Sequence, residues 1–164
     1  MLRWLIGLLA GLAIWGSTFD PAFAGKRVAP GHEFSDCAQC PVMVVVPAGR
    51  FIMGSPKGEK GHQDDESPTH KVIISQAFAA GKFEVTRGQY AAFVADSGYA
   101  VANTCWTYEK VEGKVRSGRS FRNPGYEQTD NQPVECVNWN DAQTYVKWLS
   151  RKTGAAYRLL SEAE

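Results

Sequence analysis

The sequence lacks the short signatures of the common enzyme classes. It contains no G-x-S-x-G, H-E-x-x-H or G-x-G-x-x-G segment and no P-loop. Enzymes of the α/β-hydrolase, zincin, Rossmann and P-loop types therefore have no support in the sequence. It also lacks an excess of charge of either sign, since 18 Lys and Arg residues face 17 Asp and Glu residues. Without a basic stripe, nucleic acid is not expected as a partner.

Long apolar runs are also missing, apart from one short run at the N-terminus. Residues 4–15 are mostly apolar after a start that carries Arg3, and Ala22 and Ala24 supply small residues where a signal peptidase cuts. A bilayer needs roughly 20 apolar residues, so this run is too short for a stable membrane span. We expect residues 1–24 to be a signal peptide that is cleaved after Ala24, which predicts a periplasmic or secreted protein. Residues 25–164 are enough for one domain but not for two.

Cysteines are few but even in number, and an oxidising compartment favours disulfides. Cys105 and Cys136 are the natural pair. Cys37 and Cys40 form a C-x-x-C motif, which could be redox-active or bind a metal. A redox C-x-x-C motif places its first cysteine at the start of a helix, whereas here the apolar, strand-like residues 42–46 follow. A structural bridge between Cys37 and Cys40 is the favoured interpretation.

Alternation of apolar and turn residues predicts several short strands. We read residues 25–40 as a linker containing the C-x-x-C motif and residues 41–164 as the domain. Residues 42–46 and 50–54 predict two strands that form a hairpin around Pro47 and Gly49. Further short strands are expected at residues 71–74, around Phe78 and at residues 82–85.

Two helices have clear start and stop signals. Thr86 and Gln89 form a capping box and Gly98 suits a left-handed cap, which predicts a helix over residues 87–97. Asn138 and Gly154 bound a second helix in the same way. Its predicted buried stripe is Ala142, Tyr145, Val146 and Leu149.

The segment between these helices has no clear period and is long for a loop, so a disulfide or a function is expected there. Its charged residues carry both signs and therefore indicate a solvated loop. They are Glu109, Lys110, Glu112, Lys114, Arg116, Arg119 and Arg122. Three aromatic residues of this segment could line a peptide or small-molecule cleft, namely Trp106, Phe121 and Tyr126. Tyr145 and Trp148 lie at helical spacing and suit the core.

One cluster of imidazoles and carboxylates has the residue types of a divalent-metal site. It consists of His62, Asp64, Asp65, Glu66 and His70. Neighbouring Gly and Pro residues favour a solvated acidic loop over a metal site. Residues 130–133 carry a single carboxylate and predict a turn.

The end of the sequence predicts a strand at residues 157–160, followed by a capping box formed by Ser161 and Glu164. A capping box announces a helix, and one turn alone cannot offset the cost of helix nucleation. We expect the chain to be a truncated product or a partial sequence.

Six segments in this order resemble the formylglycine-generating enzyme family, also called the sulfatase-modifying factor family. They are residues 45–55 (VVPAGRFIMGS), 66–72 (ESPTHKV), 83–86 (FEVT) with Tyr90 and Phe93, 122–125 (RNPG), 132–142 (QPVECVNWNDA) and 157–164 (YRLLSEAE). The resemblance covers the chain from about Pro41 onward. Leu160 departs from it, because family members usually have Pro there.

The resemblance implies a C-type-lectin-like α+β fold, poor in regular secondary structure, of which this chain holds the N-terminal half. It also implies copper- and oxygen-dependent oxidation of a cysteine in an unfolded sulfatase, or in another protein or peptide substrate. The family's two copper-binding cysteines and its calcium loops correspond to positions beyond Glu164, and none of the four cysteines here matches them. We therefore assign no catalytic, cofactor-binding or metal residue within this chain.

Three functions follow as hypotheses. The first is an exported copper-dependent oxidase that acts on a protein cysteine. The second is a non-catalytic, lectin-like binding or accessory module of the cell envelope, and the third is an iron-dependent oxidase that shares the domain. Alone, the chain is expected to be inactive and poorly folded, with five side chains left partly wet: Phe51, Phe83, Tyr90, Phe93 and Leu149.

Overall fold

The structure is a computed structural model that describes residues 29–164. The predicted signal peptide, residues 1–24, lies outside the described residues. Within the predicted linker, Glu33–Phe34 forms strand β1 and pairs with β2, so this part of the segment belongs to the fold. The other elements are β2 (Met43–Val46), β3 (Gly49–Met53), the 3-10 helix η1 (Asp64–Glu66), β4 (His70–Ile74), β5 (Phe78–Gly81), α1 (Arg87–Ser97), β6 (Thr104–Glu109), β7 (Glu112–Ser117) and α2 (Trp139–Thr153).

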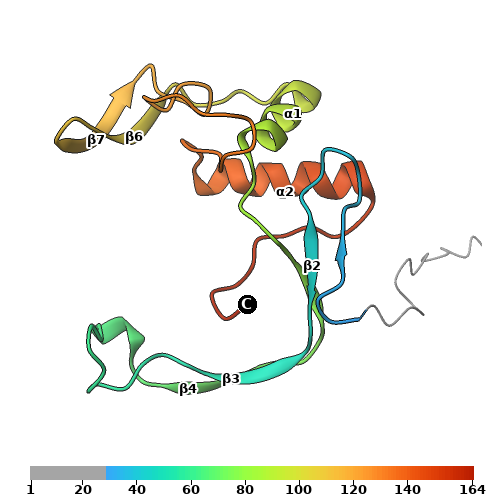
Figure 1. Cartoon of the computed structure of the whole chain (residues 1–164), viewed down its shortest axis with the longest axis vertical. Coiled ribbons are helices and arrows are strands. Elements are labelled where there is room, and N and C mark those ends of the chain that lie inside the picture. The colour runs from blue at the N-terminus through green and yellow to red at the C-terminus, as the bar shows by residue number, and fades with distance from the viewer. Residues whose placement is uncertain (1–28) are drawn as a thin grey trace, which may run out of the picture.

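Strands β2 to β5 form a bent antiparallel ribbon (Figure 1). Val46 pairs with Phe78, and Gly49 pairs with Ile74. At the bend, the two residues 47–48 therefore lie opposite the three residues 75–77. The predicted hairpin between β2 and β3 is therefore wrong. Pro47 has no amide hydrogen for a strand ladder, and here it interrupts the ribbon without reversing the chain. The reversal occurs later, in residues 54–69.

The predicted strand at residues 71–74 is confirmed as β4, and Phe78 begins β5. Residues 82–85 do not form the expected strand. The carbonyl of Val85 instead accepts a hydrogen bond from the amide of Val134 at 2.8 Å. This residue thus pairs with a distant loop rather than with the ribbon.

Both predicted helices are confirmed with their ends. Thr86 and Gln89 cap α1 reciprocally, and Gly98 adopts φ 66°. Asn138 and Asp141 do the same for α2, which ends at Gly154 with φ 76°. Each cap satisfies amides that have no partner within the helix.

The core lies between the two helices and is largely aromatic. Phe93 is fully buried, and its ring centroid lies 5.6 Å from that of Tyr145 and 5.5 Å from that of Trp148. Tyr145 and Leu149 are buried as predicted, whereas Ala142 and Val146 are only half-buried. Edge and tilted aromatic contacts each contribute about 0.5–1.5 kcal/mol beyond area burial.

Burial of this core corrects the expectation that five side chains would stay partly wet. Tyr90, Phe93 and Leu149 are at most 3% exposed, because α1 and α2 cover each other within this chain. Phe51 and Phe83 are 42% and 64% exposed. Phe51 lies in β3, and Phe83 follows the end of β5. The β3–β4 part of the ribbon stands away from the helices in Figure 1.

The segment between the helices contains a β-hairpin that the sequence did not suggest. Strands β6 and β7 pair antiparallel around residues 110 and 111, and Lys110 adopts φ 59°. A tight turn of this kind usually carries Gly or Asn, and neither stands here. The predicted loop is therefore wrong for residues 109–117, most of which belong to the hairpin strands.

The C-terminal residues also differ from the expectation. Residues 157–160 form no strand. Ser161 and Glu164 do make the reciprocal contacts of a capping box, with Ser161 N–H donating to Glu164 Oε2 at 2.9 Å and Glu164 N–H donating to Ser161 Oγ at 3.4 Å. The α+β class is confirmed. Within residues 29–164, no helix has the length and apolar character needed to cross a membrane.

Candidate functional site

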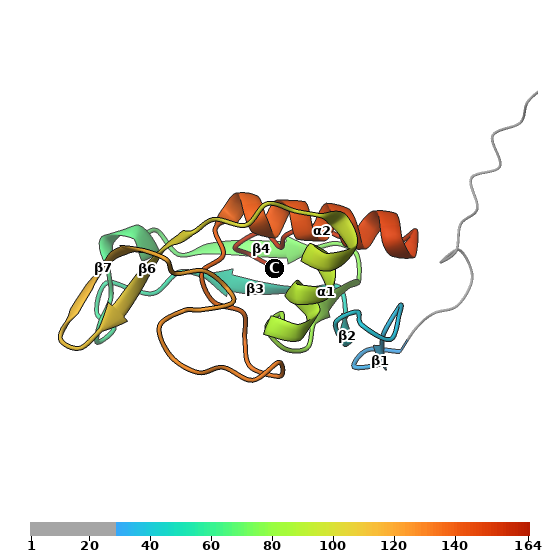
Figure 2. The same ribbon diagram turned by 90° about the horizontal axis from the view of Figure 1, so that it is seen from above.

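The candidate site is formed by the irregular segment of residues 118–134 where it meets the start of α1. Figure 2 shows this segment, in orange, looping out beside α1. The amides of Arg87 and Gly88 donate to the carbonyls of Gln132 and Asp130 at 2.8 and 2.9 Å. First-turn amides have no partner within their own helix. Their use here fixes the loop against α1 without regular secondary structure.

The segment of residues 118–134 and the start of α1 line an open cavity of about 760 Å³. Volumes of several hundred Å³ are typical of ligand sites. The lining is mostly polar and consists of Arg87, Arg122, Asn123, Gly125, Tyr126, Glu127, Gln128, Thr129 and Gln132.

The two arginines of the cavity differ in their partners. Arg87 Nη1 donates to the carbonyl of Gln128 and to Asp130 Oδ1, both at 3.0 Å. The guanidinium of Arg122 lies 4.5 Å from the ring centroid of Phe121, and within residues 29–164 it forms no ion pair. Arg122 is therefore the cation available to a carboxylate or a carbonyl oxygen in this cavity.

Gln128 and Tyr126 add an acceptor and a ring. Gln128 Nε2 donates to the carbonyl of Pro133 at 2.9 Å, while Gln128 Oε1 is buried with no donor among the described residues. A buried acceptor without a donor is costly. The side chain of Tyr126 is 55% exposed.

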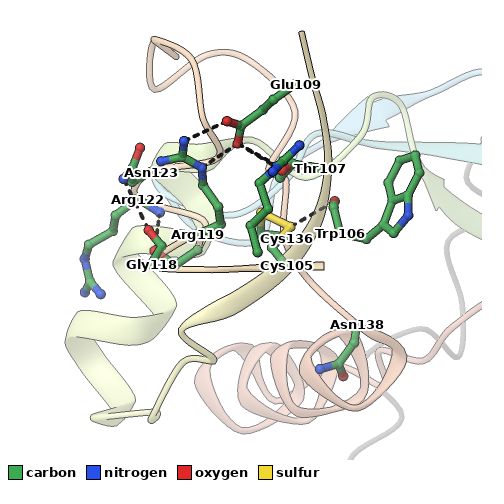
Figure 3. Close-up of a disulfide and its surroundings, with 12 residues drawn as sticks. Cys105, Trp106, Thr107, Glu109, Gly118, Arg119, Arg122, Asn123, Cys136 and Asn138 are labelled. Atoms are coloured by element: carbon green, nitrogen blue, oxygen red, sulfur yellow. Dashed lines mark hydrogen bonds and ion pairs between the residues drawn. A yellow bond between two sulfur atoms is a disulfide. The ribbon is translucent and has the colours of Figure 1, made fainter. Parts of the chain in front are cut away.

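An ion pair holds the start of the segment, and a disulfide holds the chain just after its end. Cys136 is bonded to Cys105 of β6. Close to this bond, Arg119 donates to both carboxylate oxygens of Glu109, at 2.6 and 2.9 Å, and Thr107 Oγ1 donates at 3.0 Å (Figure 3). These hydrogen bonds, with Arg119 as the main cause, lower the pKa of Glu109 to about 2. The β6–β7 hairpin and the cavity segment are thereby tied together twice.

The four cysteines form the pairs that the sequence favours, Cys105–Cys136 and Cys37–Cys40. Cys40 is buried in the helical core. Neither sulfur of the C-x-x-C motif lies at a helix start, so a structural role fits this pair.

The structure separates the three aromatic residues proposed to line a cleft. Tyr126 lines the cavity, Phe121 is buried in the core, and Trp106 is exposed on the hairpin. No sequence signal points to Gln128, and in the sequence Arg122 stands among charges that resemble a solvated loop. Arg116 and Arg119 are not free either, because both pair with Glu109.

In the cluster of His62 and its neighbouring carboxylates, Asp64, Asp65 and His70 are exposed, as expected of a solvated loop, whereas His62 is not. The His62 side chain is only 10% exposed and contacts Ser55 and Ser67. In the part of the chain that the structure describes, no three His, Cys, Asp or Glu residues gather as metal ligands. Residues 130–133 turn as predicted, with Gln132 N–H donating to the carbonyl of Thr129.

Comparison with known proteins shows which family this chain resembles. A family model described as "Sulfatase-modifying factor enzyme 1-like domain" matches residues 30–164. The formylglycine-generating enzyme of Thermomonospora curvata is 30% identical over 147 residues, covering 74% of this chain and 46% of that protein. The inactive Cα-formylglycine-generating enzyme 2 of Mus musculus is 29% identical over 153 residues, covering 77% and 46%.

A solved structure agrees with these matches. PvdO from Pseudomonas aeruginosa superposes with a TM-score of 0.70 at 39% identity, covering 83% of this chain and 49% of that one. The chain thus spans about half the length of the relatives it matches.

Proposed function

We propose, from the premise that the chain belongs to the sulfatase-modifying factor enzyme 1-like family, that it is the polypeptide-binding part of an exported formylglycine-generating-enzyme-like oxidase. The substrate would be a cysteine-containing segment of an unfolded sulfatase or of another protein. One observation carries the proposal: two of the family-like segments, residues 122–125 and 132–142, supply Arg122, Asn123, Gly125 and Gln132 to the cavity wall.

The cavity has the groups that an extended peptide requires. Arg122 donates to a carbonyl or carboxylate, and the exposed ring of Tyr126 packs against a side chain. Preformed polar groups in a concave site fix the orientation of a ligand. In this proposal the chain binds and orients the substrate.

Copper, which the resemblance implies, does not fit the residues present. Copper sites of that kind need thiolates, and all four cysteines of the chain are in disulfides. No step of an oxidation is therefore assigned to this chain. In this proposal, residues 29–164 supply neither the metal chemistry nor any calcium loop.

The two disulfides support the proposed export. Such bonds persist in oxidising compartments such as the periplasm and the extracellular space. The predicted signal peptide at residues 1–24 leads to the same compartment.

The test is turnover of a cysteine-containing sulfatase peptide by the whole protein, with aldehyde formation followed by mass spectrometry. Arg122→Ala and Tyr126→Ala should each raise KM several-fold and leave kcat unchanged, because these residues bind the peptide away from the reacting thiol. Lys114→Ala, on the hairpin outside the cavity, is the matched control. The proposal fails if no aldehyde forms, or if the cavity variants behave like the control.

A non-catalytic binding module is the second candidate function. It is favoured by the absence of free thiols among the described residues and by the match to an inactive mouse relative. Peptide binding that is lost in Arg122→Ala, without any aldehyde from the whole protein, would support this function over the first.

A further inference from the structure

We propose that Ser67 is a nucleophilic serine, activated by His62, that accepts acyl groups from small esters bound in a second cavity at the tip of the β3–β4 ribbon. This site lies in residues 54–69, apart from the peptide cavity described above. It goes beyond the proposed oxidase and binding functions and requires no metal or redox partner.

Four side chains form a continuous hydrogen-bonded chain, which we call the Ser67 relay: Ser67, His62, Ser55 and Glu66. Ser67 Oγ lies 3.0 Å from His62 Nε2, and Ser55 Oγ lies 2.7 Å from His62 Nδ1. Ser55 Oγ also donates to Glu66 Oε2.

The donors and acceptors of the relay have a single consistent direction. A carboxylate only accepts hydrogen bonds, and the hydroxyl hydrogen of Ser55 is used on Glu66. Ser55 can therefore only accept from His62, which places the imidazole hydrogen on Nδ1. In the neutral ring, Nε2 is then the acceptor, so it accepts the hydroxyl hydrogen of Ser67. The relay thus assigns His62 as the base for Ser67.

The surrounding backbone holds the relay in place. Ser55 N–H donates to the carbonyl of Glu66 at 3.2 Å, His62 N–H to that of Glu59 at 3.1 Å, and Ser67 N–H to that of Asp64 at 3.2 Å. Gly54 adopts φ 88°, and a Cβ at that position would collide with the carbonyl of Glu66. The strand end can thus approach Glu66 because residue 54 is glycine.

Burial distinguishes this histidine from an ordinary surface residue. The His62 side chain is 10% exposed, whereas the Glu66 side chain is 41% exposed. A base that is shielded from water and oriented on its other nitrogen is the arrangement found beside activated serines. Here Ser55 provides the direct contact to Nδ1, and the carboxylate of Glu66 lies 3.7 Å from it.

A cavity lies beside the relay, and both of its serines line it. It has a volume of about 440 Å³ and is lined by Ser55, Pro56, Lys57, Ser67, Pro68 and Thr69. Two proline rings give it apolar wall area, and Lys57 adds a cation. A short acyl chain beside a polar ester group suits this combination.

The acyl transfer balances without another reactant. Ser67 Oγ attacks the ester carbonyl carbon as its proton passes to His62 Nε2. The bond from that carbon to the alcohol oxygen then breaks, and His62 returns the proton to the departing alkoxide. The positive charge that His62 carries in between faces Ser55 and the Glu66 carboxylate. Water can then release the acyl group: it attacks the carbonyl carbon as its proton passes to His62 Nε2. The bond to Ser67 Oγ breaks, and His62 returns the proton to Ser67.

The test uses the whole folded protein with a fluorophosphonate probe and with p-nitrophenyl acetate. We expect covalent label on Ser67, located by peptide mass spectrometry. Ser67→Ala should abolish this label, and His62→Asn should slow it at least tenfold. Ser120→Ala is the control for a serine outside the relay and should have no effect.

Two further readouts separate catalysis from a purely structural role. The labelling rate of the natural chain should depend on pH, and this dependence should vanish in His62→Asn. Circular dichroism shows whether Ser67→Ala and His62→Asn remain folded, and Ser55→Ala offers a milder change that should slow labelling in a folded protein. Absence of label on Ser67 in the folded protein overturns the proposal, as does labelling that His62→Asn leaves unchanged. Neither outcome bears on the peptide cavity, which the Arg122 variant tests separately.

Discussion

Tyr99, just after α1, donates its phenol hydroxyl to Asp141 Oδ1 in the first turn of α2 at 2.7 Å. The other oxygen of the same carboxylate accepts the amide of Asn138 at 2.8 Å. Asp141 is only 5% exposed. The buried carboxylate of Asp141 therefore both caps α2 and connects α2 to the residue that follows α1.

Replacing this carboxylate should destabilise the fold. Asp141→Ala leaves the Tyr99 hydroxyl and the Asn138 amide without an acceptor, and we expect a loss of about 1–3 kcal/mol in the free energy of unfolding. Tyr99→Phe should cost about 1 kcal/mol. Urea denaturation of both variants and the double variant gives the coupling between the two residues. A coupling of zero would show that the contact contributes nothing.

Helix ends were predictable from the sequence because capping is local. Thr86 with Gln89, and Asn138 with Asp141, satisfy amides within three residues of themselves, so the signal and the structure occupy the same short stretch. The ribbon was not predictable in this way, since its pairing joins residues as far apart as Met43 and Gly81. Propensity located most of its strands but carried no information on their partners.

Phe93 and Phe83 should respond differently to truncation. Phe93 is 0% exposed and contacts three aromatic rings of α2 and its surroundings, so Phe93→Ala should cost about 3–5 kcal/mol. Phe83 is 64% exposed in this chain, so Phe83→Ala should change stability by no more than about 0.5 kcal/mol. Thermal or urea unfolding of the chain tests both.

The stability cost of Phe83→Ala also tests whether other parts of a longer domain cover this ring. In a longer form of the protein, a markedly larger cost of Phe83→Ala would show that this ring is covered there. Equal costs for the two variants in the present chain would contradict the burial described here.

The site was predictable only in part, for a related reason. Tyr126 was singled out because an aromatic ring in an irregular segment often contacts a ligand. Arg122 and Arg119 look alike in sequence, and only the fold pairs Arg119 with Glu109 while leaving Arg122 at the cavity. The Ser67 relay joins residues 55 to 67 through side-chain geometry that no spacing rule describes.

The Cys105–Cys136 disulfide should be the larger covalent contribution to stability. It joins residues 31 positions apart, and closing a loop of that size should contribute about 3–4 kcal/mol in the chain-entropy model. A Cys105→Ala/Cys136→Ala variant should lose this amount in urea denaturation. Under full reduction, the variant and the natural chain should have about the same free energy of unfolding.

Thiol labelling checks the pairing itself. In the denatured but unreduced protein, neither Cys105 nor Cys136 should take up an alkylating label. Uptake at either residue would contradict the disulfide.

Glu109 should make the fold sensitive to acid. Its pKa is lowered from 4.5 to about 2, mainly because Arg119 donates hydrogen bonds to the ionised form. A carboxyl group whose pKa is lower in the folded state stabilises the fold above its unfolded pKa, and this stabilisation is lost as the pH falls. The loss should begin near pH 4.5 and be complete near pH 2, the two values of the pKa.

Glu109→Gln should be less stable than the natural chain at neutral pH, and the difference should shrink across that window. Denaturation curves at several pH values measure it, with Glu127→Gln as an exposed control. A constant difference between the Glu109→Gln variant and the natural chain would show that the Arg119 pair does not act through the charge of Glu109.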